Sequence, residues 1–170
     1  MRILRYLKGT RSLSLVLGCD QSPSLIGYSD SNYTNCLNTS HSISGHCHSL
    51  GSGVISWSSK KQKVMANSSY YTEYITLHNT SHETVFLCQL LEGIGLTQTN
   101  PTPLHCNNNT VSCLAEDHIW HPQVKHIWVK YYSVCELVTN SELSITRVQS
   151  CDNIADILTK PLARPDFLHL

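Results

Sequence analysis

Charged residues are scarce in this chain of 170 residues. Lysine, arginine, aspartate and glutamate together make up only 14% of it, and the formal net charge is +0. An average soluble domain carries about 25% charged residues. The chain therefore has no global basic field that would attract nucleic acid, and any such partner must be held by a local basic patch.

Long apolar runs are missing as well. No stretch approaches the roughly 18 uninterrupted apolar residues that a membrane-spanning helix needs. The first ten residues are too charged, and their apolar run is too short, for a secretory signal. We therefore expect a protein of the cytoplasm or nucleus that is not secreted and has no membrane partner.

The cysteines show no pairing pattern. All eight are scattered singly, so we expect reduced thiols packed as small hydrophobic side chains rather than a disulfide framework. His46 and His48 share one face of a predicted strand and are candidates for a zinc site. Zinc needs about four ligands, however, and no Cys/His pair of the right spacing completes the set. The other candidates for such a site are His118, His121 and His126.

The chain has enough apolar residues, 41%, to form the core of one globular domain. Alternating or short apolar runs predict strands over residues 13–17, 25–30, 43–50, 53–58, 104–106 and 143–148. Apolar spacings of three and four predict helices over residues 2–8, 68–93, 109–116, 124–139 and 152–159. This order of strands and helices predicts a mixed α/β sheet with helices packed on its faces.

Three acidic residues stand beside residues that we predict to be buried. Asp30 ends a strand, Glu73 lies in the first turns of the long helix, and Asp156 lies in the first turns of the last helix. Each has an ordinary structural explanation. A helix dipole favours an acid at its N-terminus by roughly 0.3–1 kcal/mol, and an aspartate after a strand often caps a turn. Periodicity alone does not predict whether the three meet in space.

Five short segments follow one another along the chain: Gly27–Ser31, Ser56–Gln62, Ser68–Ile75, Lys125–Ile127 and Asn153–Leu162. In this order they resemble the motifs of the ribonuclease H domain of copia-type retrotransposon Pol polyproteins. The resemblance implies such a domain over residues 13–165. It also implies that residues 1–12 are a remnant of the connection to a reverse transcriptase and that residues 166–170 are a tail.

The resemblance implies a ribonuclease H-like fold, with a mixed five-stranded sheet flanked by helices. It also implies an endonuclease that hydrolyses the RNA strand of RNA–DNA hybrids with two Mg²⁺ ions held by four carboxylates. Carboxylates serve this role because Mg²⁺ is a hard ion that prefers anionic oxygen ligands. Three of the four carboxylates match Asp30, Glu73 and Asp156.

The remaining position departs from the family pattern. It falls in the segment Leu104–Asn109, where Asn107 stands in place of the expected aspartate. An amide oxygen brings no negative charge, and losing even indirect support of a metal ligand costs about 10–100-fold in affinity or activity. We predict a domain that folds but cleaves weakly or not at all. The alternative is a catalytically inactive relic that at most binds nucleic acid, and restoring aspartate would discriminate between the two.

A basic segment is the candidate for substrate contact. Lys60, Lys61 and Lys63 follow Trp57, and they either contact nucleic-acid phosphates or protect a solvated sheet edge. The resemblance favours phosphate contact. We expect Trp57 to lie in the core, and His126 to be a helix-surface or capping residue outside the catalytic set. The sequence predicts no oligomeric state.

Overall fold

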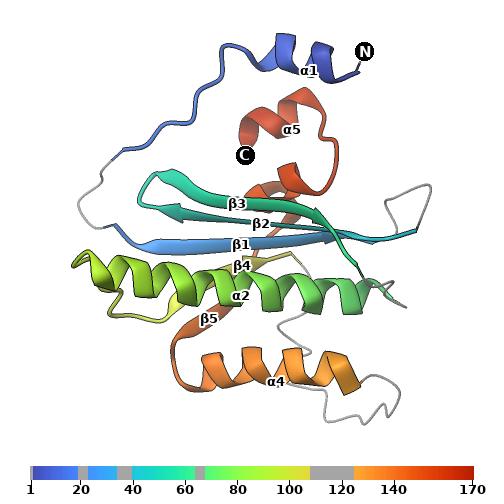
Figure 1. Ribbon diagram of the computed structural model, residues 1–170. Helices are drawn as coiled ribbons and strands as arrows, with labels where there is room; N and C mark the ends of the chain where they lie inside the picture. The colour runs from blue at the N-terminus through green and yellow to red at the C-terminus, as the bar shows by residue number, and fades with distance from the viewer. Residues whose placement is uncertain (1, 19–22, 34–39, 64–67, 108–124) are drawn as a thin grey trace.

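A five-stranded mixed sheet forms the centre of the protein (Figure 1). The computed structural model describes residues 2–18, 23–33, 40–63, 68–107 and 125–170. The strands are β1 (Leu25–Asn32), β2 (Ile43–Leu50), β3 (Gly53–Lys61), β4 (Thr102–Cys106) and β5 (Leu143–Arg147), and they stand side by side in the order β3-β2-β1-β4-β5. The first three are antiparallel, whereas β4 and β5 run parallel to β1. The sheet predicted from the sequence is therefore confirmed.

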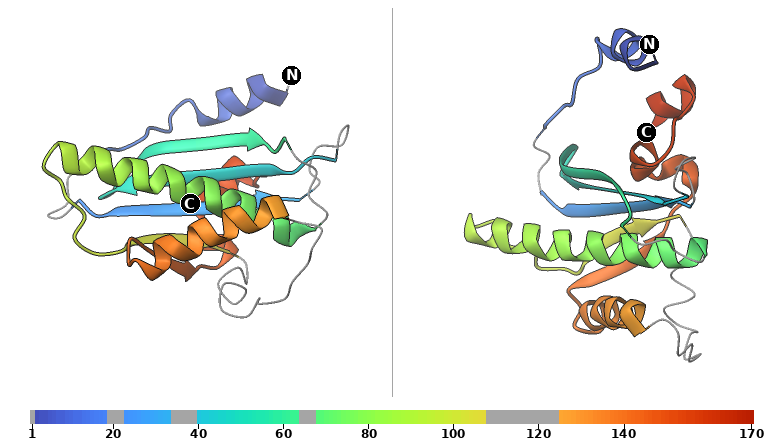
Figure 2. Two further views of the ribbon diagram at one scale, coloured as in Figure 1. Left: turned by 60° about the horizontal axis from the view of Figure 1, so that its bottom comes forward. Right: turned by 45° about the vertical axis from the view of Figure 1, so that its right-hand side comes forward.

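Helices cover the sheet on one face and short turns cover part of the other. The long helix α2 (Ser69–Gly93) lies over β1 and β2, and α4 (Lys125–Thr139) packs beside α2 and against β5 (Figures 1 and 2). On the opposite face, the 3-10 helices η2 (Ser150–Asp152) and η3 (Ile154–Leu158) follow β5, and η3 contacts β1 and β2. These two replace the single helix predicted over residues 152–159.

The C-terminal segment lies on the face of the sheet opposite α2 and α4, and the N-terminal helix comes near it there (Figure 2). Helix α1 (Arg2–Thr10) lies near α5 (Arg164–His169). The rings of Tyr6 and Phe167 make an edge-to-face contact there, with their centroids 6.1 Å apart.

A stripe of buried threonines joins α2 to the sheet. Thr72, Thr76, Thr80 and Thr84 recur every fourth residue and are fully buried. The hydroxyl groups of the last three donate to the carbonyl oxygen four residues earlier, at 2.8 Å. Since their polar atoms are satisfied within the helix, these side chains can pack against the strands as small residues. This stripe was not predicted from the sequence.

Apolar clusters hold the rest of α2 in place. One joins α2 to β4, β5 and α4 and consists of Leu77, Leu104, Val134 and Leu143. A second, near the end of α2, consists of Leu25, Leu87 and Leu91. Burying a side chain of this size contributes about 1.5–3 kcal/mol, so these clusters fix the helix on the sheet.

The strand predicted over residues 13–17 is wrong. This segment forms no strand, and Leu13, Leu15 and Leu17 are exposed. Alternation makes a strand only where a neighbouring strand completes the hydrogen-bond ladder. Here the segment only meets the beginning of β3, where Leu17 lies against Gly53.

The core position predicted for Trp57 is also wrong, because its side chain is 61% exposed. Trp57 pairs with Cys47 across β3 and β2, one residue away from the His46–Ser58 pair that faces α2. Successive strand residues point to opposite faces, so Trp57 points away from α2 on the edge strand. The large aromatic side chain therefore stands on the surface.

Some expectations fall partly outside the described residues. The helix predicted over 109–116 lies outside them, as do His118 and His121 and the side chain of His126. In the described part of the chain, Cys47, Cys88 and Cys151 are free thiols. None of the helices in the described ranges is long and apolar enough to cross a membrane.

We predict that His48 makes the fold sensitive to acid. It is fully buried under α2, with its Nε2 atom 2.8 Å from Thr84 Oγ1, and burial lowers its pKa to about 4. The unfolded chain then binds the proton more readily, so the contribution of His48 is present above pH 6.5 and lost as the pH falls toward 4. The contribution of His48 to the free energy of unfolding should fall by about 3 kcal/mol over this window.

Urea unfolding at several pH values measures this effect in the wild type and in His48→Gln. The glutamine keeps a neutral donor near Thr84 but cannot titrate. Between pH 6.5 and 4 the wild type should therefore lose about 3 kcal/mol more of its free energy of unfolding than the variant. Equal pH dependence of the two proteins would contradict the assignment.

Candidate active site

The strand register brings Asp30 next to Asn107. Asp30 lies in the central strand β1 and is 1% exposed, and Asn107 follows the last residue of β4. Ser29 pairs with Cys106 in the parallel β1–β4 ladder, so the next residue of each strand stands at the same level. Asn107 Nδ2 donates a hydrogen bond to Asp30 Oδ1 at 3.0 Å. The position expected to carry an acid thus holds an amide that stabilises Asp30.

Helix η3 carries Asp156 onto the face of the sheet to which Asp30 points. Its N-cap, Asn153, is fully buried, donates from Nδ2 to the carbonyl oxygen of Ser29 at 2.9 Å, and accepts from the amide of Ala155. Because Asn153 bonds to β1 one residue before Asp30, the beginning of η3 is fixed beside that aspartate.

The absence of a side chain at Gly45 allows this close approach. Gly45 pairs with Asp30 across β1 and β2. A Cβ atom at Gly45 would lie 2.6 Å from Thr159 Cγ2 and 2.9 Å from Leu158 Cβ, closer than such atoms normally stand. A larger residue would therefore push η3, and with it Asp156, away from the sheet.

Two residues after η3 complete the surroundings of the aspartates. The hydroxyl group of Thr159 donates to Asp30 Oδ2, and Lys160 Nζ lies 2.7 Å from Asp156 Oδ2 and 3.8 Å from Asp30 Oδ2. Asp156 itself is 3% exposed. Both oxygens of Asp30 therefore have polar partners.

Glu73 approaches from the other side of the sheet, on the second turn of α2. It is 8% exposed, and burial raises its pKa to about 8. A hydrogen bond from the Ser31 side chain opposes this shift, while the charges of Asp30 and Asp156 add to it. Ser31 neighbours Asp30 in β1, and its hydroxyl group also bonds to Thr72 Oγ1 at 2.9 Å. The structure thus gathers the three predicted acids at one end of β1.

The site contains more negative charge than its own cation neutralises. Burial raises the pKa of Asp156 to about 6, the charge of Asp30 adds to the rise, and Lys160 opposes it. Asp156 Oδ1 is buried and has no hydrogen-bond partner among the described residues. An orphaned carboxylate oxygen beside two further acids fits a hard divalent cation such as Mg²⁺. Within the described ranges, however, no group of three or more His, Cys, Asp or Glu side chains is arranged to hold a metal ion in this conformation.

Comparison with known proteins shows which family the chain belongs to, although no protein-family model matches it. Over 166 residues, 98% of its length, the chain is 37% identical to the retrovirus-related Pol polyprotein from transposon RE1 of Arabidopsis thaliana. It is 33% identical over 165 residues, 97% of its length, to that from transposon TNT 1-94 of Nicotiana tabacum. The chain spans only 11% and 12% of these two relatives.

A solved structure shares the fold of this chain. LC11-RNase H1, crystallised in complex with an RNA/DNA hybrid, superposes with a TM-score of 0.56 over 80% of this chain and 94% of that one, at 14% identity. The chain is a ribonuclease H-like domain homologous to a segment of copia-type retrotransposon Pol polyproteins. The fold that the sequence resemblance implied is thereby confirmed.

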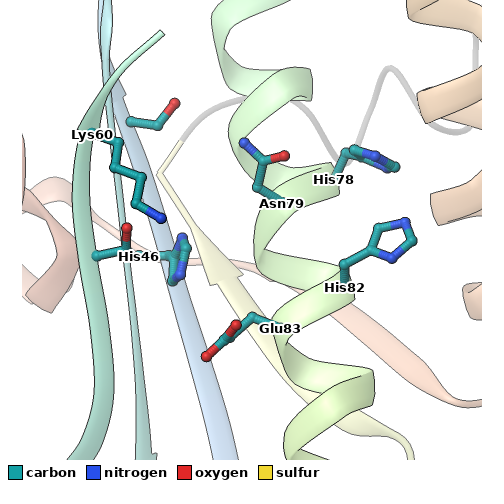
Figure 3. Close-up of a pocket in the computed structure, with 8 residues that line it drawn as sticks. His46, Lys60, His78, Asn79, His82 and Glu83 are labelled. Carbon is teal, nitrogen blue, oxygen red and sulfur yellow. The ribbon is translucent and has the colours of Figure 1, made fainter.

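The lysines predicted to contact the substrate lie on the edge strand β3 and just beyond it, two strands away from β1. All three of them, Lys60, Lys61 and Lys63, are exposed. Figure 3 shows Lys60 reaching toward His46, with Asn79 and Glu83 of α2 opposite. These side chains line a polar groove of about 480 Å³ between β2, β3 and α2.

Sequence reasoning missed the two residues that contact both aspartates most closely, Thr159 and Lys160. The available signal was their spacing, since they follow Asp156 by three and four residues. On a helical turn this spacing places side chains on one face. The same spacing is common on any solvated helix, so it gains meaning only once Asp156 is known to be buried.

We predict that Thr159→Val destabilises the domain in the absence of metal. Valine keeps the shape of threonine but removes the hydroxyl group that donates to the buried Asp30 carboxylate. Leaving a buried acceptor with one partner fewer costs about 1–3 kcal/mol. Urea unfolding at pH 7 in EDTA measures the loss. Thr146→Val, on the exposed side of β5, is the matched control and should change the free energy of unfolding little.

Proposed function

We propose that this domain binds RNA–DNA hybrids and hydrolyses their RNA strand with Mg²⁺, and that Asn107 strongly reduces the rate. The observation that carries the proposal is the gathering of Asp30, Glu73 and Asp156, from three separate elements, at one end of the central strand. The domain would encounter such hybrids in the cytoplasm or nucleus.

The three carboxylates would be the magnesium ligands. A bound metal ion lowers the pKa of a water molecule and balances the charge on the leaving oxygen. The protein would hold the ion with three carboxyl groups, one each from β1, α2 and η3. Burial has removed most water from these groups, so each gains more from a nearby cation than an exposed carboxylate would.

Asn107 weakens this site in two ways. Its amide carries no negative charge, so the site has three acids where the family has four. In addition, its Nδ2 atom donates to Asp30 Oδ1, and thereby occupies an oxygen that a cation would otherwise use. The same contact stabilises the metal-free domain, because it satisfies a buried carboxylate. The alternative function, a nucleic-acid-binding relic without activity, rests on this contact.

The lysines at the β3 edge would hold the nucleic acid. Lys60, Lys61 and Lys63 are exposed and close in sequence, as contacts to a phosphate backbone require. LC11-RNase H1, which shares the fold, was solved with an RNA/DNA hybrid bound. An RNA strand is distinguished from DNA through its 2′-hydroxyl groups.

We predict that Asn107→Asp raises both magnesium affinity and hybrid cleavage. The new carboxylate adds the missing charge, and we expect gains of about 10–100-fold, the usual cost of weakening a metal site. In EDTA the variant should be less stable than the wild type, because a repulsion replaces the bond to Asp30. Calorimetric Mg²⁺ titration, cleavage of a labelled hybrid and urea unfolding measure the three effects.

Asn100→Asp, an exposed position before β4, is the matched control and should change none of the three. If Asn107→Asp binds magnesium more tightly yet cleaves no faster, the inactive alternative is favoured. If it binds no more tightly, the acids do not form the proposed site.

We predict that replacing the three β3 lysines by glutamine weakens hybrid binding and makes it less sensitive to salt. Each lost phosphate contact should reduce the slope of log affinity against log salt by about 0.9, hence by 2 to 3 for all three. Fluorescence anisotropy of a labelled hybrid in Ca²⁺ or EDTA at several salt concentrations measures this slope.

The matched control removes the same charge from α1 and the segment after it. Arg5, Lys8 and Arg11 are exposed and are replaced together by glutamine. If this control weakens binding as much as the β3 variant, the lysines act only through net charge and their assignment to a substrate contact is wrong.

A further inference from the structure

Lys160 is the cation of the acidic cluster. Its Nζ atom lies 2.7 Å from Asp156 Oδ2 and 3.8 Å from Asp30 Oδ2. The lysine side chain is 33% exposed, whereas those of the two aspartates are 1% and 5% exposed. The ammonium group therefore stands at the solvent side of two buried carboxylates, where a cation arriving from solution would also bind.

The backbone holds Lys160 in this place. The amide groups of Thr159 and Lys160 both donate to the carbonyl oxygen of Asp156, at 3.2 Å, and Thr159 is itself tied to Asp30. Pro161 follows and cannot continue the helical turn. The four-residue spacing then directs the lysine back over Asp156, so the contact is built into the turn.

A second environment is within reach of the Lys160 side chain. Lys160 lines a cavity of about 450 Å³ between the C-terminal segment and α1. Arg5 and Arg164 line the same cavity, and their positive charge disfavours the lysine there. Lys160 therefore remains with the acids until another cation replaces it.

We propose that Lys160 is a resident counter-ion that Mg²⁺ has to displace from Asp30 and Asp156. This inference rests on the proposed function, because it assumes that the acids bind magnesium. In the metal-free domain the ammonium group reduces the net charge of the aspartate pair from −2 to −1. The lysine thereby stabilises the empty site and lowers its apparent affinity for divalent cations.

The first test compares magnesium affinity in the wild type, Lys160→Met and the control Lys8→Met, which removes an exposed charge on α1. Methionine keeps most of the lysine stem without its charge. Calorimetric titration with Mg²⁺, repeated with Ca²⁺, should show binding about tenfold tighter in Lys160→Met, with Lys8→Met close to the wild type. Lys160→Arg, which keeps the charge, should bind no more tightly than the wild type.

The second test measures the counter-ion without metal. In EDTA, Lys160→Met should lower the melting temperature, and it should lower it less when Asp156→Asn is already present. This double-mutant cycle isolates the charge interaction from any loss of packing. Equal losses in both backgrounds would refute the counter-ion role.

The outcomes separate the two proposals. If the wild type and Lys160→Met bind Mg²⁺ with equal affinity, the competition is refuted while the magnesium site stands. If neither binds Mg²⁺, and Asn107→Asp does not bind it either, the proposed function is refuted and the competition with it. Tighter binding in Lys160→Met, together with a coupling in EDTA, supports both.

Discussion

The buried carboxyl group of Asp30 organises one end of this molecule. It receives the amide of Asn107, the hydroxyl group of Thr159 and, at longer range, the ammonium group of Lys160. These partners come from the end of β4 and from the turn after η3. A burial this deep needs paired or hydrogen-bonded oxygens, so the aspartate requires both segments to be in place. The contacts that hold these two segments in the fold are therefore the same contacts that form the candidate site.

Satisfying Asp30 from within the protein works against binding a cation there. A carboxylate that is already hydrogen-bonded gains less from a metal ion than one that is not. Glu73 and Asp156 are in the opposite position: burial raises the pKa of both, and Asp156 Oδ1 has no partner among the described residues. The site therefore combines one carboxylate that hydrogen bonds stabilise with two carboxylates whose charged forms are destabilised by burial. Asn107 and Lys160 are the residues that shift this balance toward the metal-free domain.

The sequence predicted the parts of the fold that rest on local pattern. The five strands, the long helix α2 and α4 all follow from periodicity and end signals. The failures have tertiary causes. Residues 13–17 alternate like a strand but have no partner strand, and Trp57 lies on the edge strand facing away from α2. Neither fact is present in the local sequence.

The same division holds for the site. Family resemblance pointed to Asp30, Glu73 and Asp156, but periodicity could not bring them together. The proximity of Asp156 to Asp30 depends on the hydrogen bond from Asn153 to β1 and on the close approach allowed by Gly45. Thr159 and Lys160 were missed because a polar pair after a short helix is ordinary until the acid beneath it is known to be buried.

The central claim is that three buried acids at the end of β1 form one cation site. Anomalous diffraction from crystals of the domain soaked in Mn²⁺, which prefers the same oxygen ligands, tests it most directly. We predict a peak contacted by carboxylate oxygens of Asp30 and Asp156, with Glu73 turned toward it and the ammonium group of Lys160 moved away. A map with no peak there, or with Mn²⁺ bound only at other carboxylates, would contradict the account.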